Sequence, residues 1–279
     1  MIQDCECNKV FFSSLLGKRC PIAYKGLAEV LDRYGVPWSL LEGTNDIWCR
    51  DYMPIQVMTN KFVEYSYMPD YLLHKFGDRA TITDGNAICE RLGYSCDKSM
   101  NLFKLDGGNV VKAGGRAIMT GKIFDENPVN DIVFAVNRLQ NTLGARLVIL
   151  PWDINEEFGH ADGICRYIGQ GRVLMTNYGD FDCRMAARFR KILEANFKKV
   201  EELSFDTHRV HKYSWAYINW LQTEDVLILP KFGIPEDGQA FEQISDLMPQ
   251  YSGRIEMVDA NDLVVHGGCF NCCSWTIRE

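Results

Sequence analysis

Helical and strand-like hydrophobic patterns follow one another in a repeating order along the chain. Apolar residues three and four positions apart predict amphipathic helices, whereas short β-branched runs bounded by Gly, Asn or Asp predict strands. The predicted helices span residues 21–34, 86–92, 129–143, 183–197 and 236–248. The predicted strands span residues 55–58, 62–67, 101–105, 110–111, 116–120, 146–150, 164–168, 172–176, 226–230 and 255–258. The pattern therefore predicts an α/β protein.

Two of the predicted helices carry an apolar stripe on one face. In the helix over 129–143 the stripe consists of Ile132, Val133, Val136 and Leu139. In the helix over 183–197 the inward-facing residues are Met185, Phe189, Ile192 and Leu193. We expect these stripes to pack against the sheets.

Polar turns rich in Gly and Asp recur between the units at a nearly constant interval. Asp51 and Asp106 are 55 residues apart, and Asp106 and His160 are 54 apart. His160 and Cys272 are 112 residues apart, which is about two such intervals. A period of about 55 residues that fits five times into the chain is typical of a closed radial repeat. We therefore predict a single domain over residues 1–279 with fivefold pseudosymmetry and with its polar turns near the axis.

Composition and charge narrow the classes of partner. The chain is 47% hydrophobic and 24% charged, and no apolar run approaches the ~18 residues that a membrane span needs. A formal net charge of −7 disfavours a nucleic-acid binder, because neutralising phosphates requires a basic face. We expect no membrane and no nucleic acid as partner, and a small cation suits the sign of the charge. The sequence leaves homo-oligomerisation open.

The cysteine content points to a reducing compartment. Eleven cysteines form an odd set without the regular spacing of a disulfide framework. The N-terminus opens with acidic residues rather than the basic region of a signal peptide. We therefore expect reduced thiols in a cytoplasmic protein.

The closed repeat brings the residues of different turns into one central pocket: Asp51, Asp106, His160, Asp162 and Cys272. A cysteine with a lowered pKa is a strong nucleophile at neutral pH, and a histidine can exchange protons with a leaving group and with water. Carboxylates bind the planar guanidinium group through paired hydrogen bonds. The set therefore suits attack on a guanidinium carbon.

Other interpretations of the C-terminal thiols are open at this point. Cys273 is adjacent to Cys272, and either thiol could be a buried structural residue. Cys269 and Cys272 could also form half of a zinc or redox site. A structural zinc site needs four ligands, and the other close pair, Cys5 and Cys7, has the wrong spacing. No metal is predicted.

Four motifs resemble those of agmatine deiminases and of bacterial, Porphyromonas-type peptidyl-arginine deiminases. They are residues 48–54 (WCRDYMP, similar to W-x-R-D-x-G-P), 106–109 (DGGN, similar to [ED]-G-G-[NS]), 158–162 (FGHAD, similar to G-H-x-D) and 266–272 (HGGCFNC, similar to G-G-G-N-x-H-C). The resemblance continues through residues 217–220 and 228–233, so it covers the chain from about residue 45 to its end.

This resemblance implies a fold and a set of roles. The fold is the pentein fold of the guanidino-group modifying enzymes, a five-bladed α/β propeller. Cys272 would be the nucleophile, His160 the general acid and base, and Asp51 and Asp162 the clamps on the guanidinium group. The reaction would pass through a covalent thiouronium intermediate and need no metal or organic cofactor.

The resemblance also implies candidate substrates and further contacts. Agmatine, which would place the enzyme in putrescine biosynthesis, is the first candidate, and arginine in a peptide or protein is the second. Amidino transfer through the same intermediate is a third reaction. Asp106, Trp48 and Asn219 are predicted to contribute to substrate binding.

Three positions depart from the family pattern. Met53 replaces a glycine, Asn271 stands where agmatine deiminases usually carry a histidine, and Cys269 stands where asparagine is usual. The first two keep a second class of function open, a catalytically inactive pentein that acts as a guanidinium-binding or regulatory protein.

Overall fold

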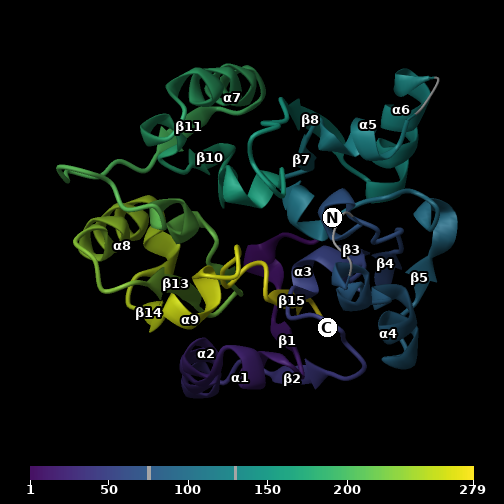
Figure 1. Ribbon diagram of the computed structural model, residues 1–279, viewed down its shortest axis with the longest axis horizontal. Coiled ribbons are helices and arrows are strands. Elements are labelled where there is room, and N and C mark those ends of the chain that lie inside the picture. Colours follow the sequence, from purple (N-terminus) through teal and green to yellow (C-terminus); the bar gives the residue numbers. More distant parts are fainter. Residues whose placement is uncertain (74–76, 129–130) are drawn as a thin grey trace.

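Five three-stranded sheets are arranged around a common centre in the computed structural model, which describes residues 1–73, 77–128 and 131–279. The longer helices lie at the periphery of this ring, and the short segments between the sheets converge on its middle (Figure 1). The predicted five-bladed α/β propeller with fivefold pseudosymmetry is confirmed. None of the helices within the described ranges combines the length and the apolar character that a membrane span needs.

Each sheet repeats one topology, in which two antiparallel strands are followed by a helix and then by a third strand parallel to the middle one. We call each sheet together with its helix a blade. The second blade comprises β3 (Ile55–Met58), β4 (Lys61–Val63), α4 (Gly85–Arg91) and β5 (Cys96–Asp97). The third blade comprises β6 (Val111–Lys112), β7 (Arg116–Thr120), α6 (Ile132–Leu143) and β8 (Arg146–Leu150). The fourth blade comprises β9 (Cys165–Gly169), β10 (Arg172–Met175), α7 (Cys183–Asn196) and β11 (Lys199–Glu202). The fifth blade comprises β12 (Leu221–Gln222), β13 (Leu227–Lys231), α8 (Glu236–Leu247) and β14 (Ile255–Asp259).

The first sheet joins the two ends of the chain and closes the ring. Its strands are β15 (Ser274–Ile277), β1 (Lys9–Ser13) and β2 (Trp38–Leu41), and the helix of this blade is α2 (Pro21–Tyr34). Val10 of β1 pairs with Thr276 of β15 on one side and with Trp38 of β2 on the other. The hydrophobic pattern did not predict β1 or β15. The C-terminal stretch therefore opens this sheet and does not complete the fifth one.

A short irregular segment precedes the first strand of every sheet and points to the ring centre. In chain order these segments are α3 (Cys49–Tyr52), η5 (Gly107–Asn109), η6 (Ala161–Gly163), η8 (Ser214–Ile218) and residues 269–273. Four of them contain the predicted polar turns, and the fifth, η8, lies in the double interval between His160 and Cys272, where no turn was predicted. Their common place in the repeat explains why residues about 55 positions apart meet in space.

Several local predictions are confirmed. The helix over 21–34 has the predicted bounds and ends at Gly35, which adopts the left-handed conformation with φ 66°. In α7, Phe189 and Leu193 are buried, and Met185 and Ile192 pack against the same cluster.

The predicted strand over 101–105 is wrong. The third strand of its sheet is β5, and the chain then turns through η4 (Lys98–Met100), where the Asp97 carboxylate accepts a hydrogen bond from the Ser99 amide at 2.9 Å. Leu102 is 90% exposed, so the apolar side chain that suggested a strand packs against no sheet.

The apolar stripe predicted for the helix over 129–143 is only partly correct. Its predicted first residues, 129–130, lie outside the described residues. Ile132 and Val133 are exposed, and the buried face of α6 is formed by Ala135, Leu139 and Leu143 at four-residue spacing. The helix is therefore rotated so that its small and leucine residues face the sheet.

Candidate active site

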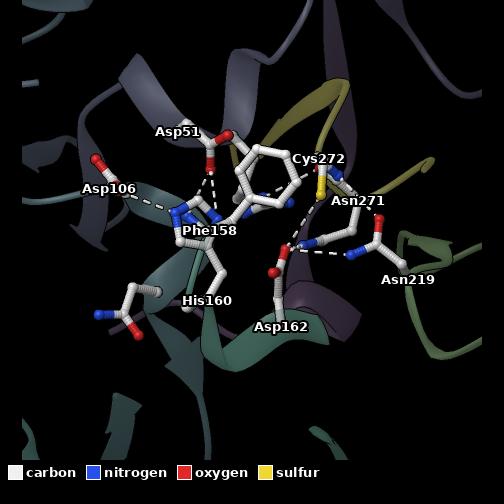
Figure 2. A network of polar contacts seen from close by, with 12 residues as sticks. Asp51, Asp106, Phe158, His160, Asp162, Asn219, Asn271 and Cys272 are labelled. Carbon is white, nitrogen blue, oxygen red and sulfur yellow. Dashed lines mark hydrogen bonds and ion pairs between the residues drawn. The ribbon is translucent and has the colours of Figure 1, made fainter. Parts of the chain in front are cut away.

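The irregular segments at the ring centre enclose a cavity of about 820 Å³. Asp51, His160, Asp162 and Cys272 line it, and the side chains converge from α3, η6 and residues 269–273 (Figure 2). Trp48 also lines the cavity. Four of the five residues that were predicted to meet in a central pocket therefore line it, whereas Asp106 does not.

Asp51 is held at the cavity by backbone groups of two other segments. The Arg50 amide donates to the Cys272 carbonyl at 3.0 Å, and the Gly108 amide donates to Asp51 Oδ1 at 3.0 Å. A Cβ on Gly108 would lie 2.6 Å from Asp51 Oδ1 and 2.7 Å from His160 Nδ1. The glycines of the motif over 106–109 thus permit the close approach of the backbone to the site.

Met53, which replaces the family glycine, has φ −83° and ψ 141°, a backbone conformation open to any residue. Its carbonyl and that of Asp51 accept hydrogen bonds from the Tyr65 hydroxyl at 2.9 Å and 2.6 Å. The substitution therefore causes no backbone strain at the segment that carries Asp51.

His160 lies between two carboxylates. Its Nε2 is 2.9 Å from Asp106 Oδ2, and its Nδ1 is 3.6 Å from Asp51 Oδ1 (Figure 2). Burial alone would lower the pKa of His160, but the carboxylates of Asp51 and Asp106 outweigh it and raise the pKa to about 9. The imidazole is therefore positively charged at neutral pH in the ligand-free protein.

Asp162 is surrounded by amide groups and a thiol. Its Oδ2 accepts hydrogen bonds from Asn271 Nδ2 at 2.7 Å and from Asn219 Nδ2 at 3.3 Å. The Cys272 thiol donates to the same oxygen at 3.6 Å, and the Cys272 backbone amide donates to Asn219 Oδ1 at 3.2 Å. Asn219 and Asn271 thus fix the carboxylate and the thiol relative to each other.

The three C-terminal thiols occupy different environments. Cys272 lines the cavity, whereas Cys273 and Cys269 are fully buried in the hydrophobic core. Burial, and then the charges of Asp162 and Asp51, raise the pKa of the Cys272 thiol well above its usual value. Cys272 is thus the thiol of this segment that can meet a ligand, and it is protonated at neutral pH while the site is empty.

The pKa of Asp51 is also shifted. Burial raises it to about 7, with the nearby Asp162 and Asp106 adding to the rise and His160 opposing it. Two carboxylates in one buried cavity resist ionising together, and a bound cation between them would relieve this repulsion.

Aromatic side chains cover the His160 side of the cavity. The Phe158 ring lies 6.1 Å from the His160 ring, and the Tyr71 ring packs edge-on against Phe158 at 5.1 Å. A Cβ on Gly267 would lie 2.8 Å from the Phe158 ring, so this glycine allows the C-terminal segment to close over it. These rings therefore cover one side of the imidazole.

Asp106 and Asn219 lie behind the cavity wall. Asp106 supports His160, and Asn219 supports Asp162 and Cys272.

The partners that sequence reasoning missed are Lys122, Tyr71 and Phe158. A lysine four residues before Glu126 is typical of an exposed helical pair, so no sequence signal marked Lys122 as buried. Among the described residues, no group of three or more His, Cys, Asp or Glu side chains is arranged to hold a metal ion.

Solved structures with the same ring of sheets include two agmatine deiminases. The enzyme from C. jejuni superposes with a TM-score of 0.78 at 16% sequence identity, covering 100% of this chain and 95% of that one. The enzyme from Enterococcus faecalis gives a TM-score of 0.77 at 18% identity, again covering 100% and 95%. Together with the axial site, this architecture defines the pentein class of α/β propeller.

The chain belongs to the Porphyromonas-type peptidyl-arginine deiminase family, whose model matches residues 28–277. A curated relative, the agmatine deiminase of Pseudomonas fluorescens strain SBW25, is 24% identical over 211 residues, which is 61% of this chain and 56% of that protein. The matched region is thus little more than half the length of this relative.

Proposed function

We propose that the protein is a C–N hydrolase that deiminates a guanidino compound, with Cys272 as its nucleophile. The observation that supports this most directly is the meeting of a thiol, an imidazole and two carboxylates, those of Asp51 and Asp162, in one buried cavity. Family membership and the agmatine deiminases that share the fold agree with it.

The guanidinium group binds between Asp51 and Asp162. A planar cation satisfies two carboxylates through paired hydrogen bonds and removes the repulsion between them. The same cation lies beside Cys272 and stabilises its thiolate. Binding of substrate therefore lets the Cys272 thiol lose its proton to solvent, and this creates the nucleophile that the empty site suppresses.

The covalent step begins when the Cys272 thiolate attacks the guanidinium carbon and forms a neutral tetrahedral adduct. The His160 imidazolium gives its proton to one amino group, the C–N bond breaks, and ammonia leaves a cationic thiouronium bound to Cys272. Neutral His160 then takes a proton from water, and the resulting hydroxide attacks the same carbon. Collapse of this second adduct breaks the C–S bond, the hydroxyl proton of the adduct passes to the departing sulfur, and the ureido product leaves with Cys272 restored as a thiol and His160 as an imidazolium.

The remaining side chains support these groups. Asp106 fixes the His160 ring, and Asn219 and Asn271 fix Asp162 and Cys272, so the predicted substrate-binding roles of Asp106 and Asn219 become positioning roles in this proposal. Trp48 borders the cavity beside Gly268 and is proposed to contact the substrate. The proposed steps use only these side chains and water.

Agmatine is the first substrate that we propose, and peptidyl-arginine is the second. The first would yield N-carbamoylputrescine on a route to putrescine, and the second would yield citrulline. We further propose a single cytoplasmic domain, since all eleven cysteines are free thiols and a reducing compartment keeps thiols in that state.

The decisive test is release of ammonia and of a ureido product from agmatine, free arginine and an arginine-containing peptide, each assayed separately. Deimination of at least one of them supports the proposal, and the ratio of kcat/KM values identifies the substrate. Tight binding of a guanidinium compound without ammonia release would show instead an inactive binding protein. Transfer of the amidino group to an added amine would show an amidinotransferase.

A further inference from the structure

Lys122 is a buried cation directly behind the His160 side of the cavity. It is the first residue of α5 (Lys122–Glu126), and its side chain is only 1% exposed. Its Nζ lies 3.4 Å from Asp106 Oδ2, the oxygen that contacts His160. Burial would lower the pKa of Lys122, but Asp106, Glu126 and Asp70 outweigh it and raise the pKa, so the ammonium stays charged.

The ammonium group connects three segments that form this side of the site. Beyond Asp106, it donates to the Phe158 carbonyl at 2.8 Å, two residues before His160. It also pairs with Asp70 at 3.0 Å, at the start of η2 (Asp70–Leu72), and lies 4.6 Å from the centre of the Tyr71 ring. The Tyr71 ring packs edge-on against His160 at 6.1 Å. Lys122 thus touches the partner of the imidazole, the loop that carries it and the ring that covers it.

An ion pair that only stabilised the fold would need a single carboxylate, whereas Lys122 faces those of Asp70, Asp106 and Glu126. Asp106 Oδ1 is buried and has no hydrogen-bond partner, so His160 and Lys122 share Oδ2 as the contacts that compensate this buried charge. A buried carboxylate without such compensation is costly and tends to take up a proton. Removing Lys122 would leave the imidazolium as the one remaining cation on that oxygen among the described residues.

We propose that Lys122 is a positioning residue of the reaction, which holds the Asp106 carboxylate in contact with His160 and fastens Tyr71 over the imidazole. Its catalytic consequence rests on the proposed function, whereas its effect on His160 does not. No bond is made or broken at Lys122.

The charged and titratable groups around this pair come from several elements. Lys122 faces Asp70 and Tyr71 of η2, Asp106, and Glu126 of its own helix at 3.7 Å. His160 faces Asp51 of α3, Asp106, Tyr71 and, through Asp106, Lys122. Because the ammonium is a like charge to the imidazolium, it lowers the proton affinity of His160.

The test is an NMR titration of the His160 ring in the ligand-free protein, with the resonance assigned by its loss in His160→Gln. We expect Lys122→Met to lower the midpoint of His160 by about half a pH unit or more, because the Asp106 carboxylate at 2.9 Å is no longer held against the imidazolium, and this loss outweighs the removal of the more distant like charge. Lys122→Arg, which keeps the charge, should leave the midpoint near that of the unmodified protein. An unchanged or raised midpoint in Lys122→Met would overturn the proposal, since it would show that Lys122 acts on His160 only as a like charge.

Two further variants separate the roles of the ammonium and keep the test meaningful should Lys122→Met fail to fold. Asp70→Asn releases η2 but leaves Asp106 in place, so we expect an unchanged His160 midpoint and a higher KM. Glu126→Gln is the matched control, since it removes a carboxylate partner that does not touch His160, and it should alter KM by less than Asp70→Asn.

If the protein deiminated none of the guanidines, the titration of His160 would still decide the role of Lys122. Equal KM values in Asp70→Asn and Glu126→Gln would overturn the fastening of Tyr71.

Discussion

The two sides of the cavity hold their reactive side chains by different means. On one side, His160 lies in a row of alternating charges, Asp51, imidazolium, Asp106 and Lys122. On the other side, Cys272 and Asp162 are surrounded by neutral amides, those of Asn219 and Asn271. We call the first the charged side and the second the amide side. Both are buried, and both are built on segments that precede a sheet.

This difference determines the protonation state of each side. Charges around the imidazole stabilise its protonated form, so the proposed acid is protonated before substrate arrives. Amides fix geometry without supplying a charge that would stabilise a thiolate, so the proposed nucleophile forms only when the substrate cation is bound. The charged side therefore sets the pH dependence, and the amide side sets the alignment and the dependence on a cationic substrate.

The largest expected effect lies at the thiol. Cys272→Ala should lower kcat by about 10⁴-fold or more, because the covalent intermediate cannot form. Cys273→Ala is the matched control one residue away in the core, and it should keep kcat within about threefold with some loss of stability. Ammonia release measured on both variants checks this, and full activity in Cys272→Ala would assign the nucleophile to another residue.

A smaller but still large effect is expected on the charged side. Asp106→Asn removes a carboxylate from His160 and should lower kcat by about 100-fold, in the range of a lost general acid or base. Because Asp106 raises the pKa of His160, the pH limit above which the acid form is lost should move from about 9 towards lower pH. A pH profile of kcat/KM measures this shift. If the alkaline limit of the profile did not move, the contact between Asp106 and His160 would not be the cause of the raised pKa.

On the amide side we expect a change in rate without a change in pH dependence. Asn271→Leu removes the 2.7 Å hydrogen bond to Asp162 and should lower kcat/KM by about tenfold, because the carboxylate loses its alignment. Asn271→His introduces the residue that the motif resemblance implies at this position and is the informative companion variant. A shift of the pH profile in Asn271→Leu would show that the two sides are not separable as described.

Much of this architecture follows from the sequence, for physical reasons. The interval between Asp51, Asp106 and His160 reflects a repeated unit, and repeated units place equivalent turns at equivalent points of a ring. The same logic selected Asp162 and Cys272 for the same cavity. Motif spacing reports position along the repeat, and position along the repeat is what the sequence encodes most directly.

The interactions between segments could not be predicted in this way. The burial of Lys122 depends on Asp70 and Asp106 reaching it from other segments. The pairing of β1 with β15 joins the ends of the chain, and no local pattern connects them. The strand expected over 101–105 is reduced to a single bridge between Lys104 and Ser66, with Leu105 buried and Leu102 exposed, and only tertiary structure decides how much of such a stretch is paired.

The smallest effect on activity is expected at Met53, despite its departure from the family pattern. The backbone there is in an ordinary extended conformation and the side chain is 1% exposed, so the methionine acts as a core residue. Met53→Gly should keep kcat/KM within about twofold but lower the free energy of unfolding by about 2–5 kcal/mol, since a buried side chain is lost. Urea denaturation and steady-state kinetics separate the two quantities, and Met53→Leu, which conserves volume, should change neither greatly. A tenfold rise in kcat/KM in Met53→Gly would mean that the methionine does displace Asp51, and the charged side would then be only partly assembled in this protein.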